Sequence, residues 1–438
     1  MCRRGVGACV LACCVIAGCG SGGSSSPPGT ADPITLNENP NILLVISDDL
    51  GLDASSNYAV GIETPVTPTL DALAANGLVF DNAWAYPACS PTRATILTGK
   101  YGFRTGVLWP GDEIFLNETS LQSFINTNVP NTYNHAVVGK WHLAGQDRTQ
   151  PGYVDHPNLM GIDYFAGLIG GGVADYFSWS LVENGRSSDS EDYTTTAFVD
   201  LTIDWIAGQQ GPWFAWLAFN APHSPLHVPP TDLYSRELSN NPTDLELYLA
   251  MIEAMDQELG RLLASFSAET RANTVIIYIG DNGTPRQVVQ GHVRAHGKGS
   301  VYEGGVAVPL IISGRGVTRI GERESALVSS VDLFSTIAAL AGSGTAEFND
   351  SKSFAGLLSS ATTGPREYAY AEIKNDMRDD WTIRNGRYKL IQRLSLAQEL
   401  YDLDADPFEQ DDLLADGTDA SEAVILAELQ MQADLIRQ

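Results

Sequence analysis

The chain has 438 residues and carries 53 acidic against 26 basic side chains, which gives a formal net charge of −27. So large an excess of negative charge argues against binding to the phosphate backbone of a nucleic acid. The chain is longer than a domain with a single hydrophobic core usually is. The sequence therefore predicts one large α/β domain with a smaller companion at its C-terminal end.

The first 18 residues have the pattern of an export signal. Arg3 and Arg4 precede a short apolar run, and small residues follow that run directly before Cys19. The run is too short to span a bilayer. Small residues before a cysteine resemble the processing site of a bacterial lipoprotein, so residues 1–18 are predicted to be removed and Cys19 to carry the lipid. Cleavage of an ordinary signal near Gly18 is the alternative.

Residues 19–38 are predicted to tether this lipid to the folded part of the chain. Gly, Ser and Pro dominate the stretch 21–33, a composition typical of a flexible linker. Gly20, directly after the cysteine, fits sorting to the outer membrane of a Gram-negative bacterium. We therefore expect an exported protein that its lipid holds on that membrane, on the periplasmic or the surface face.

Two predicted strands are each followed by oxygen-bearing side chains. Residues 41–46 and 273–279 are rich in β-branched and aliphatic side chains, as is typical of strands buried on both faces of a parallel sheet. Ligands bind at the carboxyl ends of such strands. Crowded carboxylates repel one another unless a cation compensates, and oxygen ligands suit Ca²⁺ or Mg²⁺. Ordinary turn chemistry explains each pair taken alone. The side chains concerned are Asp48, Asp49, Asp281 and Asn282.

Cys89 is the one cysteine outside the first nineteen residues. A free cysteine is usually a small buried hydrophobe, and on its own Cys89 is best explained in that way. Turn and cap residues surround the apolar run after it, the pattern of a loop that leads into a helix. The start of a helix offers free N–H groups to an anion, and Arg93 adds a fixed positive charge one turn away. The turn and cap residues are Pro91, Thr92, Thr98 and Gly99.

The run from Cys89 to Arg93, followed by Thr98-Gly99, resembles the signature of the formylglycine-dependent sulfatases of the alkaline phosphatase superfamily. In that family the cysteine is oxidised to an aldehyde after synthesis. The resemblance spans residues 39–414, and further segments agree with the family in the expected order. These are the two pairs at 48–49 and 281–282, the run 139–142 (GKWH), the turn 220–225 with His223, and the loop 296–305 with Lys298.

The resemblance implies a large mixed, mostly parallel sheet flanked by helices, with a small C-terminal antiparallel sheet. We expect a catalytic α/β domain over residues 39–366 and a small α+β subdomain over residues 367–438. Short strands are predicted there at 381–384, 388–391 and 399–403, the first two joined by the turn residues Asn385-Gly386.

The resemblance also implies a set of functional residues. The metal ligands are Asp48, Asp49, Asp281, Asn282 and residue 89 itself, around one divalent cation, Ca²⁺ in the first place and Mg²⁺ as the alternative. Cys89, as hydrated formylglycine, attacks sulfur, while Arg93 and Lys140 hold it. Lys298 and His223 bind the sulfate, and one of them protonates the leaving oxygen. His142 removes the proton that allows sulfate to leave. Lys140 and His142 are expected on one face of an extended segment.

We therefore expect a sulfuric ester hydrolase that acts on an aryl or carbohydrate sulfate and meets a formylglycine-generating enzyme during maturation. Two other functions stay open. One is a phosphonate or phosphodiester hydrolase with the same nucleophile, and the other is a non-catalytic lipoprotein that binds sulfated glycans. The rings in residues 175–179 are expected to pack in the core or to form a platform for a sugar or aryl group. Residues 247–263 are predicted to form a packing helix.

Overall fold

The computed structural model describes residues 39–130 and 132–438. The predicted signal peptide, the lipid site at Cys19 and the tether lie outside the described residues, and they stay predictions. In the part that is described, no helix is both long enough and apolar enough to cross a membrane.

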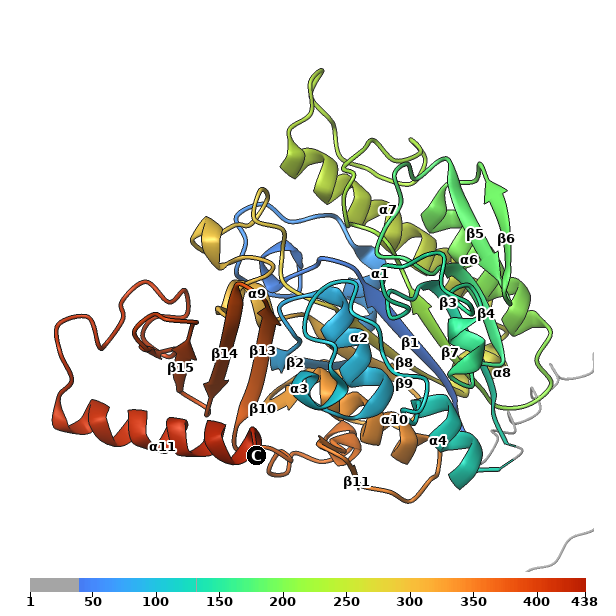
Figure 1. The fold of residues 1–438 in the computed structure, drawn as a ribbon. Coiled ribbons are helices and arrows are strands. Elements are labelled where there is room, and N and C mark those ends of the chain that lie inside the picture. Colours follow the sequence, from blue (N-terminus) through green and yellow to red (C-terminus); the bar gives the residue numbers. More distant parts are fainter. Residues whose placement is uncertain (1–38, 131) are drawn as a thin grey trace, which may run out of the picture. The chain divides into compact units, whose positions relative to one another are not determined.

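A ten-stranded mixed sheet forms the centre of the fold (Figure 1). Its strand order is β10-β2-β9-β8-β1-β7-β3-β4-β5-β6. The middle strands β8, β1, β7, β3 and β4 run parallel, whereas β9 runs antiparallel to both its neighbours and β5 and β6 form an antiparallel edge. The strands are β1 Asn41–Ser47, β2 Gly77–Trp84, β3 Asn134–Lys140, β4 Tyr164–Leu168, β5 Trp179–Glu183, β6 Arg186–Ser190, β7 Trp213–Ala218, β8 Thr274–Gly280, β9 Leu310–Gly314 and β10 Glu322–Ser329.

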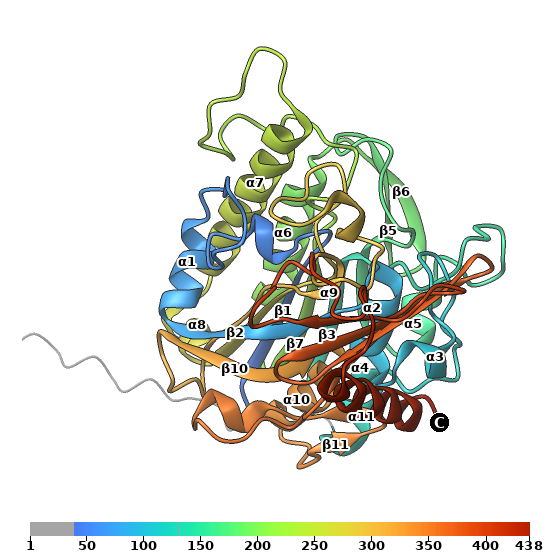
Figure 2. The same cartoon turned by 90° about the vertical axis from the view of Figure 1, so that its left-hand side faces the viewer.

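Both faces of this sheet are covered by helices, which is why β1 is buried throughout and apolar from residue 42 to residue 46. Alternate side chains of β1 enter two different cores. Ile42, Leu44 and Ile46 pack with α2, α4 and α10, whereas Leu43 and Val45 pack with α1, α6 and α7. The two views in Figures 1 and 2 show these two helical layers on opposite sides of the sheet.

The helix predicted over residues 247–263 is longer in the structure because Thr243 and Glu246 form a capping box at its start. The helices are α1 Pro68–Ala75, α2 Cys89–Thr98, α3 Gly102–Thr105, α4 Leu121–Asn128, α5 His156–Leu159, α6 Thr194–Ala207, α7 Asp244–Ala264, α8 Ala268–Ala272, α9 Glu303–Val306, α10 Leu333–Leu340 and α11 Ala420–Ile436. Short 3₁₀ turns span Leu52–Ala54, Arg294–His296, Ser330–Asp332 and Ala355–Leu358. A separate two-stranded sheet joins β11 Glu347–Phe348 to β12 Ser351–Lys352.

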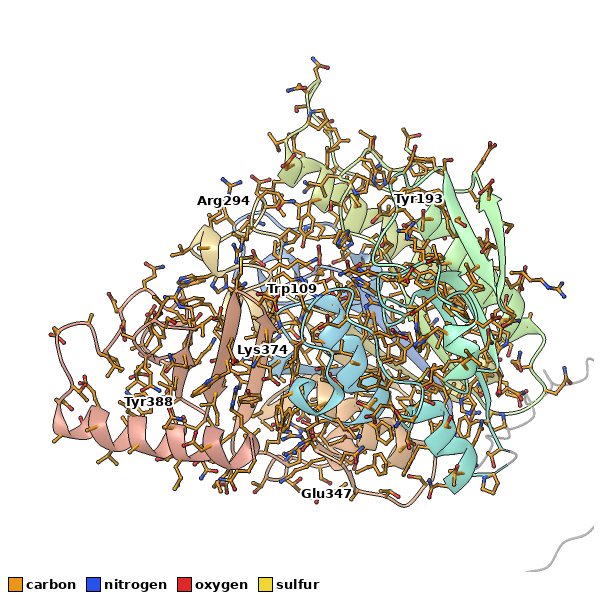
Figure 3. The ribbon with its side chains drawn as sticks, in the orientation of Figure 1. Trp109, Tyr193, Arg294, Glu347, Lys374 and Tyr388 are labelled. Atoms are coloured by element: carbon orange, nitrogen blue, oxygen red, sulfur yellow. The ribbon has the colours of Figure 1, made fainter. Side chains whose placement is uncertain are left out.

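The C-terminal part forms a four-stranded antiparallel sheet in the order β13-β14-β15-β16. Three of its strands were predicted, and the fourth, β13 Ala369–Asn375, was missed. The others are β14 Arg378–Arg384, β15 Tyr388–Gln392 and β16 Glu399–Asp402. Leu429 and Ala433 of α11 close one face of this sheet, and Lys374 lies on its first strand (Figure 3). The predicted fold class is thereby confirmed.

The small sheet does not have a core of its own. Tyr370 and Trp381 share a buried cluster with Tyr86, Tyr101 and Val331 of the preceding part of the chain. A hydrogen-bonded bridge to Leu327 of β10 holds Arg366, the residue directly before the predicted boundary. Because apolar contacts cross it continuously, the boundary at residues 366 and 367 stays a prediction.

Candidate active site

Two neighbouring parallel strands bring the acidic residues together. Strands β1 and β8 pair in register up to Ser47 and Gly280, so the residues that follow each strand meet at the same edge of the sheet. Asp48, Asp281 and Asn282 are fully buried there, and Asp49 is almost so. Asp49 has a left-handed backbone with φ of 72°, a conformation that Asp tolerates better than most residues.

These four side chains contact one another and leave oxygens unused. The backbone N–H of Asp49 donates to Oδ1 of Asp281 at 3.0 Å, and Nδ2 of Asn282 donates to Oδ1 of Asp49 at 2.9 Å. Oδ1 of Asp48 and Oδ1 of Asn282 are buried, and no hydrogen-bond partner for either lies in the described residues. An unpaired buried oxygen is costly. Both oxygens are of the kind that a hard cation binds.

The electrostatics of this edge also call for a cation. Burial, and then the neighbouring carboxylate of Asp281, raise the pKa of Asp48 to about 8. Burial also raises the pKa of Asp49, but the positive charges of Lys298, His223 and Lys140 together outweigh it and hold that pKa below its ordinary range. Carboxylate oxygens of Asp48 and Asp281 and the sulfur of Cys89 lie within 4.8 Å of one another. The residues present therefore fit a divalent cation.

Cys89 is the first residue of α2 rather than part of a preceding loop. The prediction that Pro91, Thr92 and Thr98 belong to turns is wrong, because all three lie inside the helix. Only Gly99, with φ of 65°, ends it as a cap residue. The Cys89 thiol is free and 1% exposed, and burial raises its pKa. Its sulfur lies 3.2 Å from Nδ1 of His142.

Arg93 and Lys140 are buried cations that pair with the carboxylates of Asp281 and Asp48, which together with Asp49 form the acidic edge of the sheet. Arg93 holds Oδ2 of Asp281 through two nitrogens, at 2.7 and 3.2 Å, and donates to the carbonyl of Lys140 at 2.7 Å. The ammonium of Lys140 pairs with Oδ2 of Asp48. Both cations are held by the carboxylates rather than by solvent, so their positions are fixed before any substrate arrives.

His142 reaches the site in a way that the sequence did not predict. Strand β3 ends at Lys140, and His142 has a left-handed backbone with φ of 59°. The expectation of an extended segment with both side chains on one face is therefore wrong, although both side chains do enter the site. Burial, and then the positive charge of Lys140, hold the pKa of His142 well below its ordinary value. The imidazole is thus neutral and able to accept a proton.

Lys298 and His223 lie at the mouth of the site, with side chains 21% and 23% exposed. Nζ of Lys298 is 2.5 Å from Oδ1 of Asp49, and Nε2 of His223 is 3.9 Å from Oδ2 of the same residue. Although burial opposes it, Asp49 raises the pKa of Lys298. Burial lowers the pKa of His223 to about 4. At neutral pH, Lys298 is the charged group at the mouth.

A backbone ledge without side chains borders this mouth. A Cβ on Gly171 would lie 2.3 Å from Nε2 of His142, and one on Gly172 would lie 3.5 Å from the ring of His223. A cavity of about 480 Å³ adjoins the ledge, with Arg148 and Trp179 in its lining. Gly171 is therefore packed directly against His142, and Gly172 lines the cavity and lies beside the ring of His223.

The rings of residues 175–179 have mixed fates. Tyr176 and Trp179 are buried in the core, and the Tyr176 hydroxyl donates to the carbonyls of Asn220 and His223 at 2.8 and 2.6 Å. Phe177 alone is exposed, at 39%, and it stacks on Tyr193. The expectation of core packing therefore applies to most of this group.

Asn220 was missed by the sequence analysis as a site residue. Its amide is buried, and neither of its polar atoms has a hydrogen-bond partner among residues 39–130 and 132–438. A Cβ on Gly172 would lie 3.8 Å from its Oδ1, so the amide faces the ledge. The signal was available in the sequence, because Asn220 closely follows β7 as Asp48 follows β1, and these two strands are neighbours.

Comparison with known proteins identifies the family. A family model described as Sulfatase matches residues 40–343, and a second, described as N-sulphoglucosamine sulphohydrolase, C-terminal, matches residues 291–437. The chain belongs to the sulfatase family. The family predicted from the sequence is therefore confirmed.

Relatives of this sulfatase-family protein span a range of lengths. It is 28% identical over 351 residues to YdeN, an uncharacterized sulfatase of Escherichia coli. This match covers 68% of the present chain and 61% of YdeN. It is 24% identical over 470 residues to N-acetylgalactosamine-6-O-sulfatase of Bacteroides thetaiotaomicron, covering 86% of the chain and 90% of the relative. The chain spans less than two thirds of the length of YdeN and of the mammalian relatives, such as rat arylsulfatase G at 65%.

Solved structures share the fold over most of the chain. The structure of Ps i-CgsB superposes with a TM-score of 0.78 at 26% identity, covering 91% of this chain and 92% of the other. The phosphonate monoester hydrolase of Agrobacterium radiobacter superposes with a TM-score of 0.69 at 21% identity, covering 91% of this chain and 95% of the other. The second likeness is one of fold alone.

Proposed function

We propose that this protein hydrolyses a sulfate ester of a carbohydrate, with residue 89 converted to formylglycine and one divalent cation bound beside it. The observation that carries the proposal is the position of the Cys89 sulfur, within 4.8 Å of carboxylate oxygens of Asp48 and Asp281 and 3.2 Å from His142. A nucleophile, a cation site and a neutral base thus meet at one buried point.

The ligands proposed for the cation are Asp48, Asp49, Asp281, Asn282 and residue 89. We take Ca²⁺ as the first candidate and Mg²⁺ as the second, since both prefer oxygen ligands. When bound, the cation would offset the clustered carboxylates and withdraw charge from a sulfate oxygen. When formed, the hydrated aldehyde at residue 89 would supply a hydroxyl nucleophile in place of a thiol.

The protein's own side chains divide the remaining work. Arg93 and Lys140 are fixed by Asp281 and Asp48, so they can orient residue 89 without moving. Neutral His142 lies next to residue 89 and accepts a proton there through Nδ1. These three residues prepare the nucleophile and later help to free the product.

Of the two residues at the mouth, Lys298 is better suited to protonate the leaving oxygen. Nδ1 of His223 donates to the carbonyl of Ser224 at 2.7 Å, so the neutral ring presents an unprotonated Nε2 to the site. Lys298 keeps its proton because Asp49 stabilises the ammonium. We therefore assign the proton donor to Lys298 and sulfate binding to both residues.

A carbohydrate substrate is favoured by the relatives. One matching structure is described as Ps i-CgsB with k-i-k-neocarrahexaose, at 25% identity and a TM-score of 0.76. The N-acetylgalactosamine-6-O-sulfatase of Bacteroides thetaiotaomicron is similar over most of its length. The cavity of about 480 Å³ that Gly172 lines gives a sugar ring room, and Gly172 lies beside the ring of His223.

The first test is the state of residue 89 in protein from its own host. Cleavage before aspartate releases residues 81–111, and the mass of this peptide should show the thiol replaced by an aldehyde. The same preparation should hydrolyse 4-methylumbelliferyl sulfate faster than the matching phosphodiester and phosphonate. Faster phosphodiester or phosphonate hydrolysis would establish that alternative. An intact cysteine in every copy, without hydrolysis, would favour a binding lipoprotein.

We also propose that a formylglycine-generating enzyme acts on Cys89 during maturation. A further proposal is that Cys19 carries a lipid, which anchors the protein to the outer membrane. The support for the anchor is the sequence before and after Cys19. Replacement of Cys19 by Ala should move the protein from the membrane fraction to the soluble fraction. An unchanged distribution would contradict the lipid anchor.

A further inference from the structure

One segment beside the mouth has a charge pattern opposite to that of the chain. Between Asp281 and Glu303 there is no acidic residue, although the whole chain has 53 of them in 438 positions. The same segment contains Arg286, Arg294 and Lys298. In a protein of net charge −27, a run with three cations and no anion marks a place where an anion can approach.

The arginines of this segment gather around the turn that carries Lys298. Arg286 donates through Nε to the carbonyl of Lys298 at 3.2 Å and through Nη2 to the carbonyl of Gly299 at 3.5 Å. Arg378 of β14 donates to the same Gly299 oxygen at 2.6 Å. Two guanidinium groups therefore share one carbonyl. Arg294 joins them, since its Nε donates to the carbonyl of Arg286 at 2.9 Å.

Of the three arginines in this group, two have no acidic partner among the described residues. Arg378 pairs with Asp380 at 2.6 Å. Arg286 and Arg294 form no ion pair with any residue in the described ranges. Burial, and then the positive charge of Arg378, lower the pKa of Arg286. The group is polar, positively charged and still has N–H donors to spare.

This cationic group lies next to the proposed catalytic centre. Lys298, whose carbonyl Arg286 holds, places its ammonium 2.5 Å from Asp49. The N–H of Gly299 donates to the carbonyl of Pro87 at 2.8 Å, two residues before Cys89. Figure 3 shows Arg294 on the outer side of this loop. Arg286 is thus joined to the backbone of Lys298, whose ammonium lies at the proposed catalytic centre, and Arg294 is joined to Arg286.

We propose that Arg286 and Arg294 form a second anion-binding subsite, which holds a further sulfate or carboxylate group of the same substrate. Guanidinium groups bind such planar or tetrahedral anions through paired hydrogen bonds. The inference rests on the proposed function and makes it more specific, since the preferred substrate is then a glycan with more than one anionic group. The acidic surface elsewhere repels such a polyanion, so this subsite also guides it to the mouth.

The test is equilibrium binding of sucrose octasulfate, which presents sulfates at many spacings, to the full chain with Cys89→Ala so that no turnover occurs. In this background Arg286→Gln and Arg294→Gln should each weaken binding about tenfold or more. Each should also flatten its dependence on salt. Arg186→Gln is the matched control, because Arg186 is an exposed arginine on β6, far along the sheet order.

A second probe separates binding from bracing of the loop. If Arg286 only holds the turn of Lys298, its replacement weakens the binding of 4-nitrophenyl sulfate and the binding of sucrose octasulfate by the same factor. The subsite instead predicts that the ratio of the two affinities changes about tenfold. An unchanged ratio in both variants, or an equal effect of Arg186→Gln, overturns the proposal.

Failure of the proposed function can be distinguished from failure of the subsite. Absence of sulfate hydrolysis by the matured wild-type protein would refute the enzyme but leave the binding ratios to be measured. Hydrolysis with unchanged ratios would refute only the subsite. Thermal melting of each variant shows whether it folds as the parent does, and the exposed Arg294 serves as the variant least able to disturb the fold.

Discussion

The sulfur of Cys89 lies 3.2 Å from Nδ1 of His142, and both side chains are held in the interior. No other imidazole among the described residues makes such a contact with Cys89. If residue 89 becomes the nucleophile, His142 is the base that serves it. We expect His142→Gln to lower kcat for an aryl sulfate by about 10²- to 10⁴-fold.

The control for this variant is His227→Gln. His227 also has a lowered pKa, chiefly from burial, but it contacts Tyr176 and Tyr193 rather than residue 89. Its replacement should change kcat less than threefold or so, which is the range of an ordinary surface substitution. Equal losses in the two variants would mean that neither imidazole acts as the base.

Removal of the cation should destabilise the folded protein as well as stop catalysis. Without it, Asp48, Asp49 and Asp281 crowd together in the interior and Asp48 has a pKa of about 8. We expect a chelator to lower the melting temperature by several degrees, since bound ligand stabilises the native state by mass action. Ca²⁺ or Mg²⁺ added back should restore it.

The variant Asn282→Ala checks that the effect belongs to this site. It removes the unpartnered Oδ1 and should reduce the melting-temperature shift that added cation produces. A chelator shift that is identical in Asn282→Ala and in the parent would place the cation elsewhere in the chain.

The bare ledge at Gly171 predicts a sensitive position. An added Cβ would lie 2.3 Å from Nε2 of His142, closer than atoms approach without displacement. Gly171→Ala should therefore push the imidazole aside and lower kcat by about tenfold or more. Gly356→Ala is the matched control, because nothing lies within 4 Å of its added Cβ. Similar kcat values for the two variants would show that the ledge can move.

Lys389 should be important for attachment of the small sheet. This buried lysine of β15 contacts Oε1 of Glu303 at 3.0 Å and Oε1 of Glu409 at 2.7 Å. Lys389→Met leaves Glu409 buried without a cation and leaves Glu303 with Arg384 alone, at 3.6 Å, which costs about 3–5 kcal/mol of unfolding free energy. Lys374→Met removes an exposed pair with Asp379 and should cost less than about 1 kcal/mol. Equal losses in urea denaturation would contradict the difference in burial.

His135 should make the fold sensitive to acid. Burial lowers its pKa to about 4, from an ordinary value near 6.5. Between these values the unfolded chain binds a proton that the folded chain does not, so stability falls as the pH drops from about 6.5 to 4 and is unaffected above that window. The loss at pH 4.5 is about 2.5 kcal/mol. In His135→Gln the difference between pH 7 and pH 4.5, measured in urea, should shrink by that amount, and parallel curves would contradict it.

The central strands were predictable because each is a continuous apolar run. Residues 41–46 and 273–279 predicted β1 and β8 within a residue of their ends. Burial on both faces leaves little room for other patterns, so the sequence is unambiguous there. The acidic edge follows directly from the parallel pairing of these two strands.

Other features depend on contacts that no local pattern shows. Strand β13 was missed because Glu372 and Lys374 interrupt its apolar residues, and only its pairing with β14 makes it a strand. The left-handed turn at His142 was missed because a φ of 59° is uncommon for any residue except glycine, and no local pattern signals it. Asn220 was missed because its position after β7 was the one signal, and a single polar residue at such a position is also typical of an ordinary turn.

The hydrogen bond from the Thr92 hydroxyl to the carbonyl of Asp281 joins residues 189 positions apart. It helps to bury the start of α2, and Cys89 with it. An enzyme that converts Cys89 has to reach it before this contact forms, while the segment is still accessible. At 5–20 residues per second, synthesis of the intervening chain takes roughly 10–40 s. If Cys89 is converted as we propose, the conversion therefore has to precede this step of folding, and late synthesis of β8 gives the modifying enzyme time to act first.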